Sequence, residues 1–448
     1  MQGSPKLALE DGSRIGVIGG GPAGSLFSNF LLQMAERVGM DVAVDIYEGK
    51  DFSVLGPAGC NMSSCIISEP LVQTLATDGI NLPPLVVRRG IDSYVLHMDV
   101  GNVHIETPLH EMRIAAVHRG TGPRRIQETK GHSFDGYLLN LAVERGANLV
   151  VGRVEEVGWN EGRPRVKTKD GSSQDYDLLA VAAGVNSSVL KLFEEAGFGY
   201  KPPVTSRGYI REFCLGEETV ESYLGSSMHI FLPDIPRVDF ACLIPKGEFA
   251  TMVLLGHDVD QQLVQSFLDA PEVRACLPPE SYDAEVCCNC SPRMNVQGAV
   301  QPYADRVVFI GDSGVSRLYK DGMGAAYRTA KAAAVTAIFE GVSADDFRRH
   351  FEPTCRSLEA DNRLGKLVFT ATHQVKTRRY VRRGLLRMVC REQEGEDGRR
   401  RMSTVLWDTF TGSAPYRRVF LRAVHPLFLG QFLWDIALGL WPAGGSKQ

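Results

Sequence analysis

The sequence lacks the features that mark several classes of protein. It has no uninterrupted apolar run of about 18 residues, the minimum for a membrane-spanning helix. No charged-then-apolar leader precedes its first strand-like segment. Its 10 cysteines are not spaced as in small disulfide-rich scaffolds, and it shows neither internal repeats nor low-complexity stretches. We therefore expect a cytoplasmic globular protein with reduced thiols, and 448 residues leave room for two or three domains.

Charge is nearly balanced overall but unevenly distributed. From Asn362 onward there are 16 Lys or Arg against 6 Asp or Glu, a surplus of +10. The formal net charge is −4, so the preceding part of the chain carries −14. A basic C-terminal region of this kind is typical of proteins that meet an anionic surface or partner.

A glycine-rich turn near the start predicts a nucleotide site. The stretch IGGGPAG links an apolar strand (14–20) to a helix with apolar residues at helical spacing (22–38), and a second strand (41–49) follows. Such a βαβ unit is typical of a parallel sheet with helices on its faces. The expected binding residues are Gly19, Gly21, Pro22, Ala23, Gly24 and Glu48.

Each of these residues has a physical reason. The first glycine permits the tight turn, the second lets the backbone approach a diphosphate, and the third lets the helix pack on the strand. The helix N-terminus attracts the anion. Glu48, at the end of the second strand, can hold a pair of ribose hydroxyls. The turn by itself does not separate NAD from FAD.

A second motif, nearly three hundred residues away, favours FAD. In the stretch 306–334 a buried strand runs into Gly311-Asp312, and Gly322, Met323 and Gly324 then open a helix of small residues. The acid can take a ribityl or ribose hydroxyl. The helix N-terminus can approach a flat ring and stabilise the negative charge of a reduced flavin. NAD binding needs no such second site.

Together the two motifs resemble the p-hydroxybenzoate hydroxylase-type flavoproteins, and within them the geranylgeranyl reductase group. The likeness covers about residues 13–345. It is carried by GCNMSSCIIS (59–68), FDGYLLNLA (134–142), FACLIPKGEFATMVLLG (240–256) and the Gly-Asp block. The stretch AAGVNSSVLK (182–191) departs from the family pattern, because Ala183 stands where an acid is usual.

The patterns, with this resemblance, predict an α/β fold in three parts. A discontinuous Rossmann-type FAD-binding domain with a parallel sheet is expected at 13–85, 130–200 and 295–345. A mostly antiparallel β substrate domain is inserted at 86–129 and 201–294, where apolar and polar residues alternate. A helical, basic C-terminal region occupies 346–448.

The resemblance implies hydride transfer from reduced flavin to a C=C bond of an isoprenoid or other apolar substrate. Prenyl reductases line the cavity with Tyr-x-Trp-x-Phe-Pro, and here the corresponding positions are Phe240, Cys242, Ile244 and Pro245. No second glycine triplet is evident, so a transient donor is expected: NAD(P)H, a ferredoxin or a quinol. Two alternatives remain: a monooxygenase acting through a C4a-oxygen adduct, and an electron-transfer flavoprotein serving a membrane partner.

The catalytic residues are less well defined. Cys60 and Lys320 are the candidates, Cys60 because it lies near the expected flavin. The proton donor for a C=C reduction could be water, a thiol or Lys320. Cys60, Cys65 and the CCNC stretch (287–290) could also meet as a metal or iron–sulfur site, but their spacing favours ordinary packing. Histidines 97, 104, 110 and 118 have no ligand spacing, so no metal is expected.

The tail leaves two interpretations open. LRAVHPLFLGQFLWDIALGLW (421–441) is strongly apolar, and upstream lie Arg378, Arg379, Arg382, Arg383 and the run 399–401. This combination suits docking at a membrane interface, on its cytoplasmic face. It equally suits a helix packed on the body with a solvated basic face. Nucleic acid is not an expected partner, because the aromatic residues do not lie between the basic ones.

Overall fold

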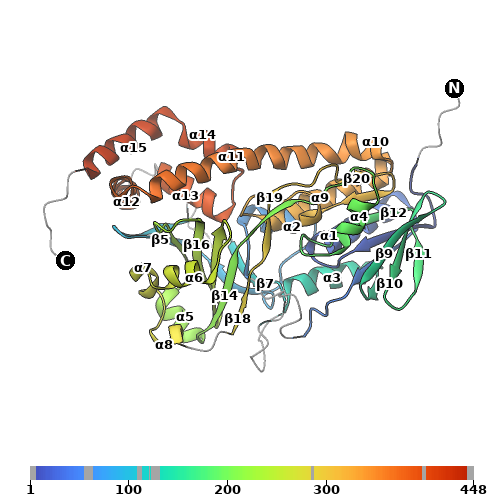
Figure 1. The fold of residues 1–448 in the computed structure, drawn as a ribbon, viewed down its shortest axis with the longest axis horizontal. Helices are drawn as coiled ribbons and strands as arrows, with labels where there is room; N and C mark the ends of the chain where they lie inside the picture. Colours follow the sequence, from blue (N-terminus) through green and yellow to red (C-terminus); the bar gives the residue numbers. More distant parts are fainter. Residues whose placement is uncertain are drawn as a thin grey trace.

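The computed structural model describes residues 7–54, 64–107, 114–120, 122, 132–283, 287–395 and 400–440. A parallel sheet with its helices forms one end of the molecule and a large antiparallel sheet forms the other (Figure 1). A long C-terminal helix runs along both, with shorter helices following it. Cys60 and Arg399 lie outside the described residues.

The six-stranded sheet has the order β20-β21-β12-β1-β2-β8, and its pairs are parallel except for β20 with β21. Helices α1, α3 and α9 pack together beside it and share its main apolar core. The strands are β1 (Ser13–Ile18), β2 (Val42–Glu48), β8 (Asn148–Val151), β12 (Leu178–Val181), β20 (Tyr303–Ala304) and β21 (Val307–Phe309); the helices are α1 (Pro22–Val38), α3 (Phe134–Glu144) and α9 (Gly322–Val335). The predicted α/β class is confirmed.

The seven-stranded sheet has the order β18-β14-β17-β16-β15-β5-β6 and is antiparallel except between β15 and β5. Its two faces belong to different cores, because successive side chains of a strand point to opposite faces. Phe240, Cys242 and Ile244 point into one core, whereas Ala241 and Leu243 point into the other. The strands are β5 (Ser93–Met98), β6 (Gly101–Glu106), β14 (Tyr209–Cys214), β15 (Ser227–Phe231), β16 (Val238–Lys246), β17 (Phe249–Gly256) and β18 (Cys288–Cys290).

Smaller elements complete the body. Sheet β3-β7-β4 comprises β3 (Ser64–Ile67), β7 (Ile114–His118) and β4 (Val87–Ile91); sheet β11-β10-β9 comprises β11 (Ser173–Asp175), β10 (Arg163–Thr168) and β9 (Val154–Asn160); β13 (Val204–Arg207) pairs with β19 (Arg293–Gln297). The helices are α2 (Glu69–Thr77), α4 (Val189–Glu195), α5 (Glu217–Leu224), α6 (Gln261–Leu268), α7 (Pro271–Arg274) and α8 (Glu280–Asp283), with a 3-10 turn at Gly311–Ser313.

The C-terminal region is helical. Its helices are α10 (Ala344–Asp346), α11 (Glu352–Lys376), α12 (Arg379–Glu394), α13 (Arg401–Thr411), α14 (Tyr416–Ala423) and α15 (Pro426–Gly439). Helix α10 and the start of α11 pack on the core of the parallel sheet, whereas α12 and α13 cover one face of the seven-stranded sheet. Apolar residues of α12 and α13 share a core with β5, β15 and β16, and α15 packs on α12 (Figure 1). Among the described residues, no helix is both long and apolar enough to cross a membrane.

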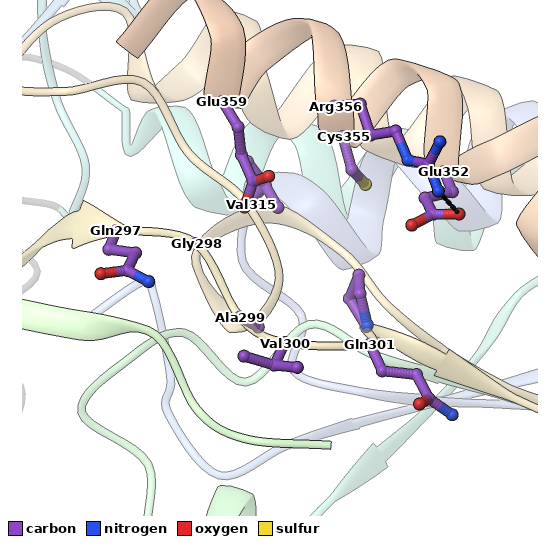
Figure 2. A pocket seen from close by; sticks show the side chains of 11 residues that line it. Gln297, Gly298, Ala299, Val300, Gln301, Val315, Glu352, Cys355, Arg356 and Glu359 are labelled. Carbon is purple, nitrogen blue, oxygen red and sulfur yellow. Dashed lines mark hydrogen bonds and ion pairs between the residues drawn. The ribbon is translucent and has the colours of Figure 1, made fainter. Parts of the chain in front are cut away.

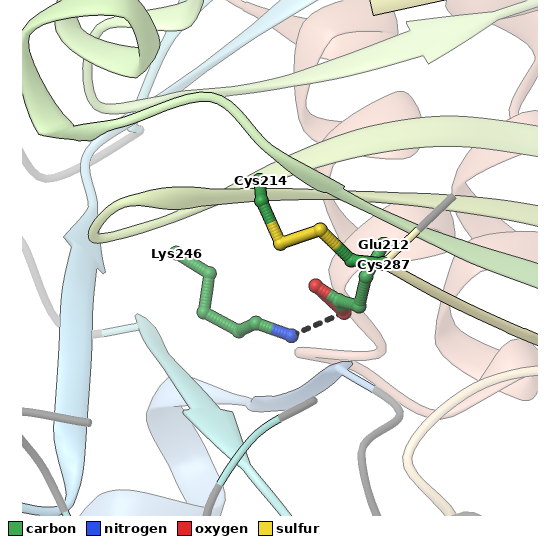
Figure 3. The surroundings of a disulfide bond; sticks show 4 residues. All are labelled: Glu212, Cys214, Lys246 and Cys287. Carbon is green, nitrogen blue, oxygen red and sulfur yellow. Dashed lines mark hydrogen bonds and ion pairs between the residues drawn. A yellow bond between two sulfur atoms is a disulfide. The ribbon is translucent and has the colours of Figure 1, made fainter. Parts of the chain in front are cut away.

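The expectation of reduced thiols throughout was wrong at one place. Cys214, at the end of β14, forms a disulfide with Cys287, the residue before β18, with a Cα–Cα distance of 6.2 Å. The pairing of β14 with β18 brings these cysteines together across 73 residues of chain. Figure 3 shows the disulfide beside a buried ion pair between Lys246 Nζ and Glu212 Oε1 (2.5 Å).

Candidate active site

The glycine turn between β1 and α1 has the geometry that its spacing predicts. Gly19 has a φ of 107°, and a Cβ there would lie 2.5 Å from the carbonyl oxygen of Ala182. A Cβ on Gly24 would lie 1.9 Å from the carbonyl oxygen of Gly19. A Cβ on Gly21 would meet only Arg119 Nη2, at 3.8 Å. Packing therefore requires the first and third glycines, whereas the second faces open space.

Charged groups surround this space. The Arg119 guanidinium, after β7, pairs with Asp135 at 2.7 Å and also extends toward Gly21. The Glu48 carboxylate accepts hydrogen bonds from the backbone N–H of Gly20 (2.9 Å) and of Lys50 (2.8 Å). Glu48 thus fixes the shape of the turn as well as standing at the predicted ribose position. A helix N-terminus beside a guanidinium is a suitable place for a diphosphate.

The second motif lies directly against the first. Gly311 has a φ of 58°, and a Cβ there would lie 2.6 Å from Cβ of Ala23, at the start of α1. The Gly311 N–H donates to Thr329 Oγ1 of α9 (2.9 Å), which fixes the loop on that helix. The Asp312 residue is exposed, and its backbone carbonyl accepts from Asn295 Nδ2 (3.1 Å). Two stretches far apart in sequence therefore line one region.

The start of α9 is held by ion pairs. Asp321 caps the helix by accepting from the Gly324 N–H (3.1 Å), and a Cβ on Gly324 would collide with this carboxylate. Arg317 and Arg328 both pair with Asp321, at 2.9 and 3.0 Å. Gly322 is exposed, which leaves its backbone accessible to a ligand.

The other two predicted cofactor residues lie at the same two helix starts. Pro22 is buried at the first position of α1, where its missing N–H costs no helical hydrogen bond. Met323 is partly buried against the core shared by α1 and α9. All the predicted cofactor residues thus belong to the adjoining β1–α1, β2 and β21–α9 segments.

Lys320 and the predicted substrate strand meet, although 80 residues separate Lys320 from Phe240. The Lys320 Nζ lies 3.1 Å from the centroid of the Phe240 ring. Burial lowers the pKa of Lys320 from 10.5 to about 7, with an opposing Coulombic contribution from Cys242. Burial also raises the pKa of the Cys242 thiol to about 12. The geometry therefore places a lysine that can lose its proton near neutral pH beside an apolar strand.

Aromatic side chains from other elements complete the surroundings of this strand. Phe410 of α13 packs against Phe240 with ring centroids 5.6 Å apart. Trp407 of the same helix stacks on Tyr94 of β5 at 4.5 Å. Ile244 and Pro245 are buried in the strand itself. Aromatic residues of α13 and β5 therefore pack in the same core as the predicted substrate strand.

Sequence reasoning missed Arg119, Trp407 and Phe410. Arg119 lies beside poorly patterned sequence, and nothing in its neighbourhood indicates an anion site. Trp407 and Phe410 belong to a tail in which apolar residues are frequent, and only the contact of α13 with β16 gives them a role. The basic composition of the tail predicted contact with an anionic surface or partner, and not a packed aromatic cluster.

The cysteines that could have met at a metal lie partly outside the described residues. Cys60 lies outside the described residues, and of Cys65 only the strand β3 is described. In the CCNC stretch, Cys287 forms a disulfide with Cys214. The structure therefore leaves Lys320 as the predicted catalytic residue whose surroundings can be described.

Two hollows lie away from the glycine motifs. Figure 2 shows one of about 270 Å³ between the 297–301 loop and α11, lined by Val315, Cys355 and Glu359 among others. Burial raises the pKa of Glu359 there. None of the predicted site residues lines it. It adds no group that suits flavin chemistry.

The second hollow is an open groove of about 600 Å³ between α13 and α14–α15. We call it the arginine groove. Its lining combines cationic and apolar side chains, namely Arg400, Arg401, Thr404, Arg418, Leu421, Arg422, His425, Leu427 and Phe428. Such a lining suits a ligand with an anionic head and an apolar tail.

The fold is shared with solved flavoenzyme structures. A p-nitrophenol 4-monooxygenase from Pseudomonas putida has a TM-score of 0.58 and 16% identity, with 91% of this chain and 99% of that chain covered. A geranylgeranyl bacteriochlorophyll reductase-like protein from Thermoplasma acidophilum has a TM-score of 0.56 and 13% identity, covering 96% and 100%. A Klebsiella pneumoniae protein solved in complex with FAD has a TM-score of 0.51 and 16% identity, covering 95% and 99%.

No family model matches the sequence, and no curated protein matches it. The structural likenesses show that the chain has the fold of FAD-dependent oxidoreductases and monooxygenases, as the two glycine motifs predicted. At these identities the likeness establishes the fold, and the chemistry must be argued from the residues of this chain.

Proposed function

We propose that the chain is an FAD-dependent oxidoreductase that reduces a C=C bond of an apolar, isoprenoid-type substrate, with Lys320 as the proton donor. One observation carries this proposal. A partly buried lysine with a pKa of about 7 lies between the start of α9 and the apolar strand β16.

The residues fit FAD. The open space at Gly21, the N-terminus of α1 and the Arg119 guanidinium suit a diphosphate. The contact of Gly311 with Ala23 brings the second motif to the same place, and the exposed Gly322 leaves room for a ring at the start of α9. Bound FAD, once reduced by a transient electron donor, would supply the hydride for the reduction.

Lys320 suits the transfer of the accompanying proton. Addition of a hydride to one alkene carbon leaves the other carbon to take a proton from a nearby acid. A general acid is most effective when its pKa is close to the working pH, and Lys320 meets this condition because its ammonium is desolvated. The contact of its ammonium with Phe240, on the predicted substrate strand, supports this role.

An apolar substrate also fits the C-terminal helices. Leu427, Leu433 and Trp434 of α15 are 60–63% exposed, and the arginine groove opens beside them. We propose that this surface rests on an anionic membrane from which the substrate is taken. Arginines attract the lipid head groups, while exposed Leu and Trp side chains enter the interface.

The test is an anaerobic incubation of dithionite-reduced enzyme with a total lipid extract, followed by mass spectrometry. A product about two mass units heavier than its precursor is expected, the signature of added hydride and proton. Lys320→Met should abolish its formation. Lys201→Met, which changes an exposed lysine, should leave it unchanged.

Other outcomes would contradict the proposal in distinct ways. Oxygenated products that appear only after oxygen is admitted would identify a monooxygenase, the class of the Pseudomonas protein that shares the fold. Reoxidation by quinone alone, without any change in the lipids, would identify an electron-transfer protein. Equal product from Lys320→Met and the native chain would remove Lys320 from the reaction.

A further inference from the structure

Three potential metal ligands converge on the face of the seven-stranded sheet opposite Phe240. His97 lies on β5 and His229 on the neighbouring strand β15, while Cys276 follows α7. All three are buried, with exposed fractions of 7%, 6% and 4%. Their ligand atoms lie within 4.8 Å of one another although 132 and 179 residues separate His97 from the other two.

Two of the separations between these atoms are close to those around a tetrahedral zinc ion. Zinc binds imidazole nitrogen at about 2.0–2.1 Å and thiolate sulfur at about 2.3 Å, so tetrahedral neighbours are about 3.3 Å (N to N) and 3.6 Å (S to N) apart. His97 Nε2 lies 3.0 Å from His229 Nδ1 and 3.6 Å from Cys276 Sγ. All three ligand atoms lie within 4.8 Å of one another, so small side-chain movements would bring them around one ion.

A hydrogen bond to the backbone favours the tautomer of His229 that can bind a metal through Nδ1. Its Nε2 lies 3.3 Å from the backbone carbonyl oxygen of Leu224, to which it can donate. A proton held there leaves Nδ1, which lies 3.0 Å from His97 Nε2, free of hydrogen. Metal-bound histidines are commonly oriented in this way by a carbonyl or carboxylate.

A metal is bound by neutral imidazole and by thiolate. The Cys276 thiol donates to the Glu272 carbonyl at 3.3 Å. It would release this proton on binding the cation.

We propose that His97, His229 and Cys276 form a zinc site that fastens α7 to the seven-stranded sheet. Within the described part of the chain the ligand group has these three members, so a water molecule completes the tetrahedron. A set of two imidazoles and one thiolate binds zinc in preference to magnesium or calcium. The site is separate from Lys320 and from the glycine motifs, and it does not rest on the proposed reaction.

The experiment measures zinc in the purified full-length chain by native mass spectrometry, after zinc loading and removal of loose metal with a weak chelator. About one zinc per chain is expected in the native protein. His97→Ala and Cys276→Ser should fall to the background of a fully chelated sample. His104→Ala, which removes an exposed histidine from the adjacent strand β6, should retain the full amount.

A second measurement keeps the test valid if a variant folds poorly. Cobalt(II) in place of zinc in the native chain should give the visible spectrum of a tetrahedral site with a thiolate-to-metal band. Strong chelation should lower the Tm of the native protein and of His104→Ala alike. A native chain that binds no zinc, that holds copper alone, or that keeps its zinc in Cys276→Ser would overturn the proposal.

Discussion

At the scale of single residues, Gly21 and Gly24 show how one residue type meets two different needs. A Cβ on Gly24 would overlap a backbone oxygen that cannot move without breaking the turn. A Cβ on Gly21 would enter the space where the diphosphate is proposed to lie. The spacing of the glycines was visible in the sequence. Only the contacts in the structure distinguish the glycine needed for folding from the glycine proposed to be needed for ligand binding.

Substitution of these glycines should therefore have different effects. Gly21→Val should fold normally yet purify colourless, because its side chain blocks the diphosphate. Gly24→Ala should lose roughly 1–3 kcal/mol of stability from overpacking. Absorbance of bound flavin and urea unfolding distinguish the two. A yellow Gly21→Val protein would remove the assignment of FAD to this turn.

Lys320 should titrate far below an ordinary lysine. Its amine should react with an acylating reagent with a midpoint near pH 7, because burial disfavours the ammonium. The neutral amine is the reactive form, so labelling should rise as pH passes through that midpoint. Competitive labelling with mass spectrometry measures it, with exposed Lys201 as the internal control. Equal midpoints for both lysines would contradict the proton-donor role.

At the scale of elements, α13 connects the predicted substrate strand with the start of α9. Its aromatic residues pack on β16 and β5, and its C-terminal end is tied to the cofactor region. Arg317 donates to the carbonyl oxygens of Gly412 (3.1 Å) and Ala414 (2.9 Å) while pairing with Asp321. The C-terminal region is thus joined to the cap of α9.

Removal of the α13 side chain at this contact should be costly. Phe410→Ala should lower the free energy of unfolding by about 3–5 kcal/mol, since a buried ring is lost and a cavity remains. Phe339→Ala, at a position that is 52% exposed, should change stability by less than about 0.5 kcal/mol. Urea denaturation of both variants checks this. Equal losses would mean that α13 does not pack on the sheet in solution.

At the scale of the whole molecule, some residues of the last helix are buried against the body and others are exposed on the surface. Phe428 and Asp435 of α15 are buried, and Asp435 pairs with Arg391 of α12. Leu433 and Trp434 of the same helix face outward. The two interpretations of the tail are therefore compatible: the helix packs on the body and still presents an apolar surface.

Binding to anionic vesicles should depend on this surface. The double change Leu433→Ser and Trp434→Ser should weaken partitioning by at least about tenfold, since each buried side chain contributes about 1.5–3 kcal/mol. Val151→Ser, at an 82% exposed apolar position on β8, serves as the control. Vesicle sedimentation at low and high salt measures both variants. Unchanged partitioning of the double variant would contradict the docking proposal.

The sequence by itself determined the local features. It predicted α1 as 22–38, as the structure has it, because a glycine turn, a proline at the first position and helical apolar spacing are all local. It also placed the second strand and the Gly-Asp turn, and through them the flavoenzyme fold. These features are encoded by neighbouring residues, so no tertiary contact was needed to find them.

Only the tertiary structure decided what the individual side chains do. The low pKa of Lys320 arises from its burial against β16, and the disulfide arises from the pairing of β14 with β18. The cluster of His97, His229 and Cys276 joins three distant segments. Burial and ligand geometry depend on which distant segments meet, and spacing along the chain carries no information about that.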